Sequence, residues 1–96
     1  MYLVRNVFHA KPGMVKELVK KWKQAMPVAE KKGFKNGRIL TDVSSTFWTF
    51  IYEFEIENLD DFERGENFSS EPEVKKIMDG YMDLVQGGYR EIFKIA

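Results

Sequence analysis

The chain has 96 residues, which suits one small domain over residues 1–96, and its 15 basic residues balance its 15 acidic residues. A net charge of zero gives no overall field that favours nucleic acid, an anionic membrane or a strongly charged substrate. The lack of cysteine excludes disulfides, thiolate metal sites and a cysteine nucleophile.

The first predicted element is a strand from Tyr2 to His9, in which successive side chains alternate between two faces. Asn6 lies on one face of this strand, and Arg5 and His9 lie on the other. The sequence Lys11-Pro12-Gly13 then breaks the strand and opens a helix, because proline has a fixed φ suited to a helix start.

The first predicted helix carries one apolar stripe with helical spacing. Its members are Val15, Leu18, Val19, Trp22, Met26 and Ala29. Pro27 falls late in this pattern and predicts a kink, or an end to the regular helix near Ala25. Gly33 is a natural stop after the last turn.

Two strands follow and form a predicted hairpin. The first runs from about Phe34 to Val43, and Gly37 within it indicates a bulge or a close backbone approach. Ser44-Ser45 is the predicted turn. The next strand, Thr46 to Ile56, has a fully apolar side that needs a partner layer. That side consists of Trp48, Phe50, Tyr52, Phe54 and Ile56.

The last third of the chain predicts a short helix from Leu59 to about Arg64, ended by Gly65. A second helix has capping-box spacing, with Ser70 as its cap and Glu73 three residues on. The apolar stripe of this second helix is Val74, Ile77, Met78, Tyr81 and Val85. We expect Gly87-Gly88 to end it and Tyr89 to Ile95 to form the fourth strand.

The element order β-α-β-β-α-β predicts an α+β, ferredoxin-like fold with a four-stranded antiparallel sheet and two helices on one face. Right-handed connections place the first and third strands in the centre of the sheet and the second and fourth at its edges. The aromatic surface exceeds what two short helices can cover. We therefore expect a homodimer formed through the sheet.

The chain resembles the dimeric α+β barrel superfamily in this element order and in its aromatic third strand. Two short sequences add to the resemblance, namely Lys11-Pro12-Gly13 directly after the first strand and FSSEPEV (Phe68 to Val74). That group includes antibiotic-biosynthesis monooxygenases, haem-degrading monooxygenases, NIPSNAP-like proteins and stress-responsive barrel proteins. The resemblance implies two sheets packed face to face in a shared barrel, with a pocket between each sheet and its helices. It does not fix an activity, because the superfamily holds enzymes and non-enzymes.

The resemblance also implies catalytic roles for Asn6 and Trp48, since such monooxygenases carry an asparagine on the first strand and a tryptophan on the third. The amide would hold an enolate or an oxygen species, and the indole would close a dry pocket. The structural alternative is that Asn6 satisfies a buried polar atom and that Trp48 supplies core area. Haem ligation of the superfamily's type is not expected, because the stretch from Glu71 to Gln86 has no histidine.

Several further residues are candidates. His9 is a candidate general base, or a solvated residue at a strand end. Tyr52 and Tyr81 are candidate ligand contacts in an apolar pocket, or core residues, as is Tyr89. Arg5 and Arg38 would attract an anionic substrate group, or would pair with acidic residues on neighbouring strands.

Glu53 and Glu55 share one face of their strand but do not make a metal site without further ligands, so no metal is predicted. They are interpreted as the polar side of the strand or as dimer contacts.

Two functional hypotheses follow. The first is a cofactor-independent monooxygenase acting on an aromatic or polyketide-like small molecule. The alternative is a non-enzymatic dimeric barrel that binds a small apolar ligand or a protein partner. The N-terminus lacks a signal-peptide pattern, and no apolar run approaches the roughly 20 residues that cross a bilayer, so we expect a cytoplasmic protein with no membrane or nucleic-acid partner.

Overall fold

The computed structural model describes residues 1–60 and 70–96. Its elements, in chain order, are β1 (Tyr2–Ala10), α1 (Val15–Lys31), β2 (Lys35–Thr41), β3 (Thr49–Ile56), α3 (Pro72–Ile77), the 3₁₀ helix η2 (Tyr81–Leu84) and β4 (Val85–Lys94). Most of the short helix predicted from Leu59 to Arg64, with Gly65 after it, lies outside the described residues.

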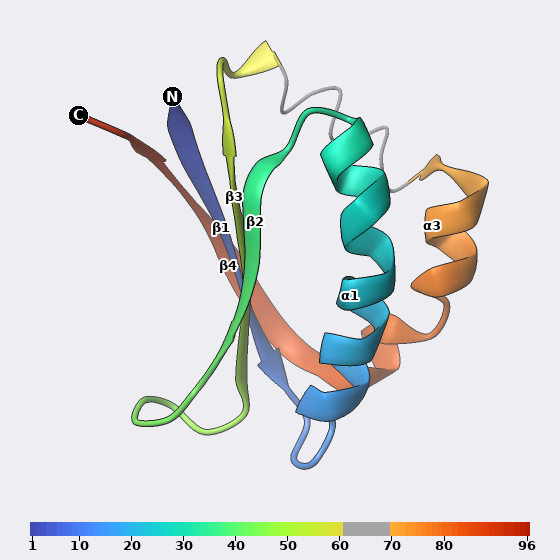
Figure 1. The fold of residues 1–96 in the computed structure, drawn as a ribbon. Helices are drawn as coiled ribbons and strands as arrows, with labels where there is room; N and C mark the ends of the chain where they lie inside the picture. Colours follow the sequence, from blue (N-terminus) through green and yellow to red (C-terminus); the bar gives the residue numbers. More distant parts are fainter. Residues whose placement is uncertain (61–69) are drawn as a thin grey trace.

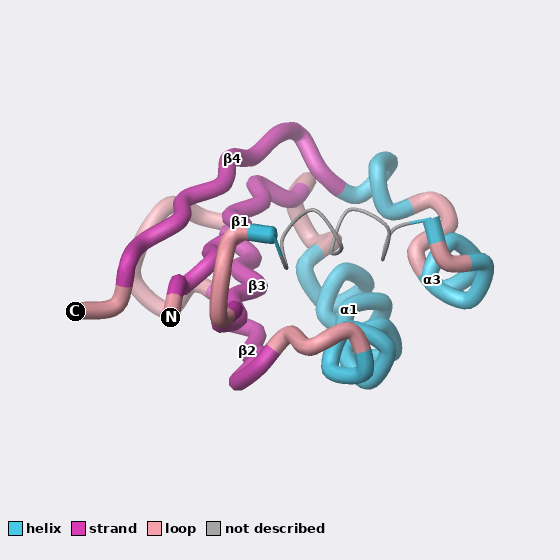
Figure 2. The backbone as a smooth tube through the Cα atoms, turned by 90° about the horizontal axis from the view of Figure 1, so that it is seen from above, coloured by secondary structure: helices cyan, strands magenta, loops and turns pink. Residues whose placement is uncertain are grey.

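The four strands form one antiparallel sheet in the order β2-β3-β1-β4, so the predicted strand order is confirmed. Figure 1 shows α1 and α3 on the same side of this sheet, and Figure 2 shows the same two layers from above, with β4 curving along one edge. We call the side toward α1 the helix face and the opposite side the open face. The ferredoxin-like fold that the sequence predicts is therefore present.

The hydrophobic core lies between the helix face and α1. In the register of the central strands, Val4 lies opposite Phe54 and Phe8 lies opposite Phe50. The apolar stripe of α1 packs onto these residues, and its Trp22 ring lies 5.9 Å from the Phe8 ring and 6.2 Å from the Phe50 ring. The apolar side of the third strand, from Phe50 to Ile56, thus has the partner layer that its alternation predicts, and in the structure that layer is the helices.

Helix α1 continues through Pro27 to Lys31, so the prediction that its regular part ends near Ala25 is wrong. A proline at this position removes a single N–H donor from the helix. The helix continues past it because Ala25 and Ala29 are both buried against the core. Gly33 does end it as predicted, with φ of +94° and its N–H donating to the Glu30 carbonyl at 3.1 Å.

The predicted irregularity at Gly37 is also present. The pairing of β2 with β3 shifts register between Lys35 and Arg38, which is a β-bulge. Asn36 in this bulge adopts a positive φ of +53°. A Cβ atom on Gly37 would lie 3.4 Å from the Tyr52 hydroxyl, so the backbone here closely approaches a core side chain.

Strand β3 begins at Thr49, three residues later than predicted, and the hairpin loop is longer than the Ser44-Ser45 turn. Asp42 causes part of this difference, because its Oδ1 accepts the Thr49 N–H at 2.9 Å. The Thr49 hydroxyl donates to the Thr46 carbonyl at 2.7 Å and closes the loop from within. Trp48 consequently lies outside the strand, with a positive φ of +62°.

The second predicted helix is shorter than its apolar stripe indicates. Its N-cap is Glu71, with no side-chain cap, so the capping box expected from Ser70 to Glu73 is not formed. Pro72 takes the first helical position, where its missing N–H has no cost. The helix ends at Ile77, and Gly80, with φ of +80°, turns the chain into η2.

Strand β4 starts at Val85, four residues before the predicted start at Tyr89. Gly87-Gly88 is therefore part of a strand, and the prediction that it ends a helix is wrong. The reason lies at Gly88, where an added Cβ would lie 2.3 Å from the Val7 carbonyl oxygen. The glycine permits close pairing of β4 with the central strand β1.

Candidate functional site

Asn6 is buried on the helix face of β1, and both ends of its amide are engaged. Its Oδ1 accepts a hydrogen bond from Nε of Arg90 on β4 at 2.6 Å, and its Nδ2 donates to the Tyr52 carbonyl at 3.5 Å. The second bond is long and therefore weak. The amide thus bridges three strands, which matches the structural alternative that Asn6 satisfies buried polar atoms.

Tyr52 lies opposite Asn6 on β3 and is also buried. Burial raises the pKa of its phenol to about 12, and the negative charge of Glu30 adds to the increase. The phenol is therefore protonated at neutral pH and cannot act as a base. Its ring lies 4.9 Å from the ring of Trp22, whose buried Nε1 has no hydrogen-bond partner among residues 1–60 and 70–96.

Trp48 lies at a different place, in the loop between β2 and β3. It is exposed, and its carbonyl accepts the N–H of Ala10 at 2.8 Å. Tyr52, which pairs with Asn6, is four residues away along the chain, or about 13 Å at the rise of a β-strand. The structure does not bring Asn6 and Trp48 into one pocket.

An open cleft of about 440 Å³ lies beside Trp48, between the hairpin loop and the first turn of α1. Its lining residues are Val15, Lys16, Thr41, Asp42, Phe47 and Trp48. The walls are mostly apolar, and Lys16 and Asp42 supply one charge of each sign. This composition suits a small apolar molecule that carries a polar group.

The other candidate residues are dispersed. His9 lies on the open face opposite Thr49, with its ring 6.1 Å from the Tyr89 ring. Tyr81 begins η2 and packs against the core from the helix side. Arg38 lies on the open face of β2. The candidate site residues therefore occupy at least three separate regions; they are Asn6, His9, Arg38, Trp48, Tyr52 and Tyr81.

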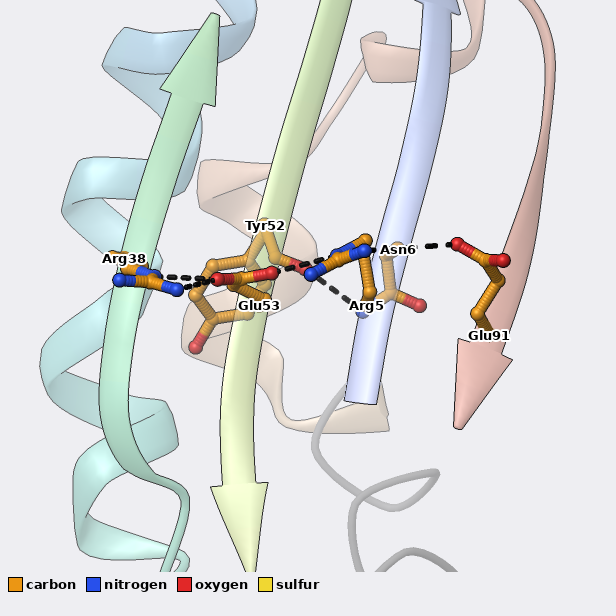
Figure 3. Close-up of polar contacts among 6 residues, drawn as sticks. All are labelled: Arg5, Asn6, Arg38, Tyr52, Glu53 and Glu91. Atoms are coloured by element: carbon orange, nitrogen blue, oxygen red, sulfur yellow. Dashed lines mark hydrogen bonds and ion pairs between the residues drawn. The ribbon is translucent and has the colours of Figure 1, made fainter. Parts of the chain in front are cut away.

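Four charged side chains cross the open face in one row, which we call the ion row. Its members, in strand order, are Arg38 on β2, Glu53 on β3, Arg5 on β1 and Glu91 on β4 (Figure 3). Arg5 Nε lies 2.8 Å from Glu53 Oε2, and Arg38 donates to the other Glu53 oxygen. Arg5 Nη1 lies 4.0 Å from Glu91 Oε1. The predicted pairing of both arginines with acids on neighbouring strands is confirmed.

Glu53 has 0% of its surface exposed, which the sequence pattern did not predict for the polar side of a strand. Burial alone would raise the pKa of its carboxyl group, but hydrogen bonds from Arg5 and Arg38, together with their positive charges, lower it overall. The hydrogen bond to Glu53 likewise raises the pKa of Arg5. Glu53 is therefore ionised at neutral pH and serves to join three strands.

Apolar side chains flank the ion row on the open face. Leu40, Tyr89 and Phe93 are all exposed there, and the Arg5 guanidinium lies 5.5 Å from the centre of the Phe93 ring. The expectation that Tyr89 packs in the core is therefore wrong, because its position in β4 places it beside Val7 on the open face. The open face thus combines an exposed apolar surface with a fixed set of charges.

Known structures share this architecture. Protein Atu4242 from Agrobacterium tumefaciens, described as a NIPSNAP family protein with unknown function, aligns with 100% of this chain and 94% of its own, at a TM-score of 0.84 and 16% identity. An uncharacterised NIPSNAP domain protein from Burkholderia xenovorans aligns with 100% of this chain and 95% of its own, at a TM-score of 0.81 and 12% identity. A protein described as an antibiotic biosynthesis monooxygenase aligns with 100% of this chain and 99% of its own, at a TM-score of 0.76 and 9% identity.

The chain has the fold of these proteins. This confirms the fold that its resemblance to the dimeric α+β barrel superfamily implied. Identities of 9 to 16% establish the fold alone, so the activity has to be argued from the site. The sequence matches no protein-family model and no curated protein.

Within residues 1–60 and 70–96, no three side chains of histidine, cysteine, aspartate or glutamate gather in a way that could hold a metal ion. No helix in the same part of the chain is long and apolar enough to cross a membrane.

Proposed function

We propose that this protein is a homodimeric barrel that binds a small apolar molecule in the cleft beside Trp48. The observation that supports the dimer is the open face, which presents Leu40, Tyr89 and Phe93 to solvent around the ion row. The helices labelled in Figures 1 and 2 lie on the other side of the sheet. A second copy packed on the open face would bury these side chains, and sheets pack face to face about 10 Å apart.

The observation that supports ligand binding is the conformation of Trp48. A bulky residue with positive φ is energetically unfavourable, and such residues persist where the surrounding contacts hold them in place. Here the bond from the Ala10 N–H and the bonds made by Asp42 and Thr49 hold the loop. They place the Trp48 indole on the wall of the cleft while leaving it exposed. An exposed, fixed indole is a suitable surface for a flat apolar ligand.

The test uses two measurements on the same protein. In sedimentation at micromolar concentration we expect a species of twice the 11.3 kDa of one chain. The fluorescent probe 1-anilinonaphthalene-8-sulfonate should bind, and Trp48→Ala should weaken its binding at least about tenfold, since removing a tryptophan from a binding surface often costs 2 kcal/mol or more.

The matched control is Met82→Ala, which removes another exposed apolar side chain, on η2 rather than on the cleft. It should leave probe binding unchanged. Equal affinity in the Trp48→Ala variant and the parent would refute the cleft as the binding site, and a single 11.3 kDa species would refute the dimer.

A second candidate function is a cofactor-independent monooxygenase. Asn6 favours it, because Arg90 orients a buried amide beside Trp22 and Tyr52, and an amide donor of this kind can stabilise an enolate. The name of one structural relative, an antibiotic biosynthesis monooxygenase, adds support for considering this chemistry.

If this candidate is correct, the protein should consume oxygen when given an anthrone, with one O₂ used and one water released for each methylene converted to a ketone. Asn6→Ala should reduce that rate by at least about a hundredfold, the size of effect seen when an oxyanion donor is removed. Asn58→Ala, at an exposed asparagine after β3, should retain the full rate. Oxygen uptake by the Asn6→Ala variant at the parental rate would exclude this role.

A further inference from the structure

The charges of the ion row alternate in sign across the whole sheet. From β2 to β4 the order is Arg38, Glu53, Arg5 and Glu91, or positive, negative, positive, negative (Figure 3). The two inner members satisfy each other, and the Glu53 side chain is only 1% exposed. The two outer members remain accessible, with 64% of the Arg38 side chain and 41% of the Glu91 side chain exposed. Recognition by a partner would therefore involve the outer members.

When the strands of the two sheets are aligned, two identical open faces can meet in two ways about a twofold axis lying between the sheets. An axis along the row would place each residue over its own copy, so that Arg38 faces the partner's Arg38 and like charges meet. An axis parallel to the strands reverses the row. Arg38 then faces the partner's Glu91, and every position in the row meets the opposite charge. Juxtaposed like charges disfavour a complex strongly, so the row selects the second arrangement.

The apolar side chains of the open face agree with the second arrangement. In the row next to the ion row, Leu40 pairs with Ile51 on β3, and Tyr89 pairs with Val7 on β1. Leu40 and Tyr89 thus occupy opposite edges of the sheet, and both are exposed. Rotation about an axis parallel to the strands brings Leu40 over the partner's Tyr89, so one operation covers both apolar edges.

We propose that the ion row sets the orientation of the dimer, with the twofold axis parallel to the strands and Arg38 of each chain paired with the partner's Glu91. This inference rests on the proposed homodimer and names its contacts. It assigns to Arg38 and Glu91 a role in recognition that is separate from the role of Glu53 within one chain.

The test is a charge exchange between two variants. Arg38→Glu alone places two carboxylates opposite each other at both ends of the row, and Glu91→Arg alone places two guanidinium groups there. Each variant should dimerise at least about tenfold more weakly than the parent in sedimentation equilibrium. When the two variants are mixed, every outer contact again joins opposite charges. The mixture should therefore form heterodimers above the half expected from random pairing, which native mass spectrometry measures.

The mixing step separates the interface from effects within one chain. Arg38→Glu also places a second carboxylate beside Glu53, but that cost is the same in a homodimer and in a heterodimer. The matched control is a mixture of Lys20→Glu and Glu17→Lys, two exposed positions on α1, which should give random pairing. A monomeric parent would overturn the homodimer itself. A dimeric parent whose Arg38→Glu and Glu91→Arg variants each dimerise as tightly as it does would overturn only the orientation set by the ion row, because an axis along the row leaves like charges facing each other in the parent and in both variants.

Discussion

Alanine in place of Gly88 is expected to lower the free energy of unfolding by about 3 kcal/mol, at the upper end of the cost of overpacking. The added Cβ atom would lie 2.3 Å from the Val7 carbonyl oxygen and 3.2 Å from the Phe8 Cα. Both contacts are to the backbone of β1, which is held between β3 and β4. No flexible side chain can move aside, so relief requires the two strands to separate. Urea denaturation followed by circular dichroism measures the loss.

Gly87→Ala is the matched control for this prediction. The two glycines are adjacent in the same strand, yet no atom of the described residues other than its own chain neighbours lies within 4 Å of a Cβ built on Gly87. This substitution should be neutral or slightly stabilising, because alanine restricts the unfolded chain more than glycine does. Equal losses at both positions would show that the close approach to Val7 is not the cause.

The same glycine pair shows where prediction from the sequence reaches its limit. A double glycine after an apolar helical stripe is a reasonable helix stop. It is equally compatible with a strand whose backbone closely approaches a neighbouring strand. Which of the two structures forms depends on the strand that packs beside the glycines. Gly80 lies between the end of α3 and η2, and no local sequence pattern distinguishes its role from that of Gly88.

Removing the charge of Glu53 is expected to lower the free energy of unfolding by an amount comparable to that for Gly88→Ala. Loss of one partner from a buried ion pair usually costs about 3 to 5 kcal/mol. The side chains of Arg5 and Arg38 are 33% and 64% exposed, so water compensates them in part, and we expect Glu53→Gln to cost about 2 kcal/mol at pH 7. Glu55→Gln is the control, because Glu55 lies two residues away on the same strand, is only half-buried and accepts a hydrogen bond from Asn36 Nδ2 at 3.2 Å.

The ion row also predicts the direction of the pH dependence. The pKa of Glu53 in the folded protein lies below its ordinary value of 4.5. Its contribution to stability is therefore complete above about pH 4.5 and is lost as the pH falls through the folded-state pKa. The difference in stability between the parent and Glu53→Gln should shrink over that acidic range. A difference that stays constant from pH 7 into that range would contradict the ionised state of Glu53.

Alternation along β1 and β3 was sufficient to predict the fold. Apolar residues alternate with a period of two within each of these strands, which places Val4 of β1 and Phe50 and Phe54 of β3 on the apolar faces of their strands. The element order then determines which strands are neighbours. The candidate site was less predictable. The partner of Asn6 is Arg90, which is 84 residues away along the chain, so no local pattern reveals the bond. Strand register does connect them, but register is known only once the strands are paired.

The position of Trp48 depended on a different kind of information. Its alternation with Phe50 and Tyr52 predicts a strand residue on the apolar side. The competing interaction is the bond from Thr49 N–H to the Asp42 carboxylate, which begins the strand one residue after Trp48. Side-chain bonds to the backbone compete with strand pairing in this way, and they depend on geometry that residue types alone do not specify.

The bulge in β2 has a consequence for how this sheet can grow. An unpaired edge is a template on which further chains can add strand by strand into open-ended filaments. The register shift between Lys35 and Arg38, with Asn36 at positive φ, breaks the regular spacing of donors and acceptors along the β2 edge. The β2 edge is therefore a poor template for pairing with another chain. A filament needs each chain to pair at both of its edges, so a chain that adds at the β4 edge does not start an open-ended filament.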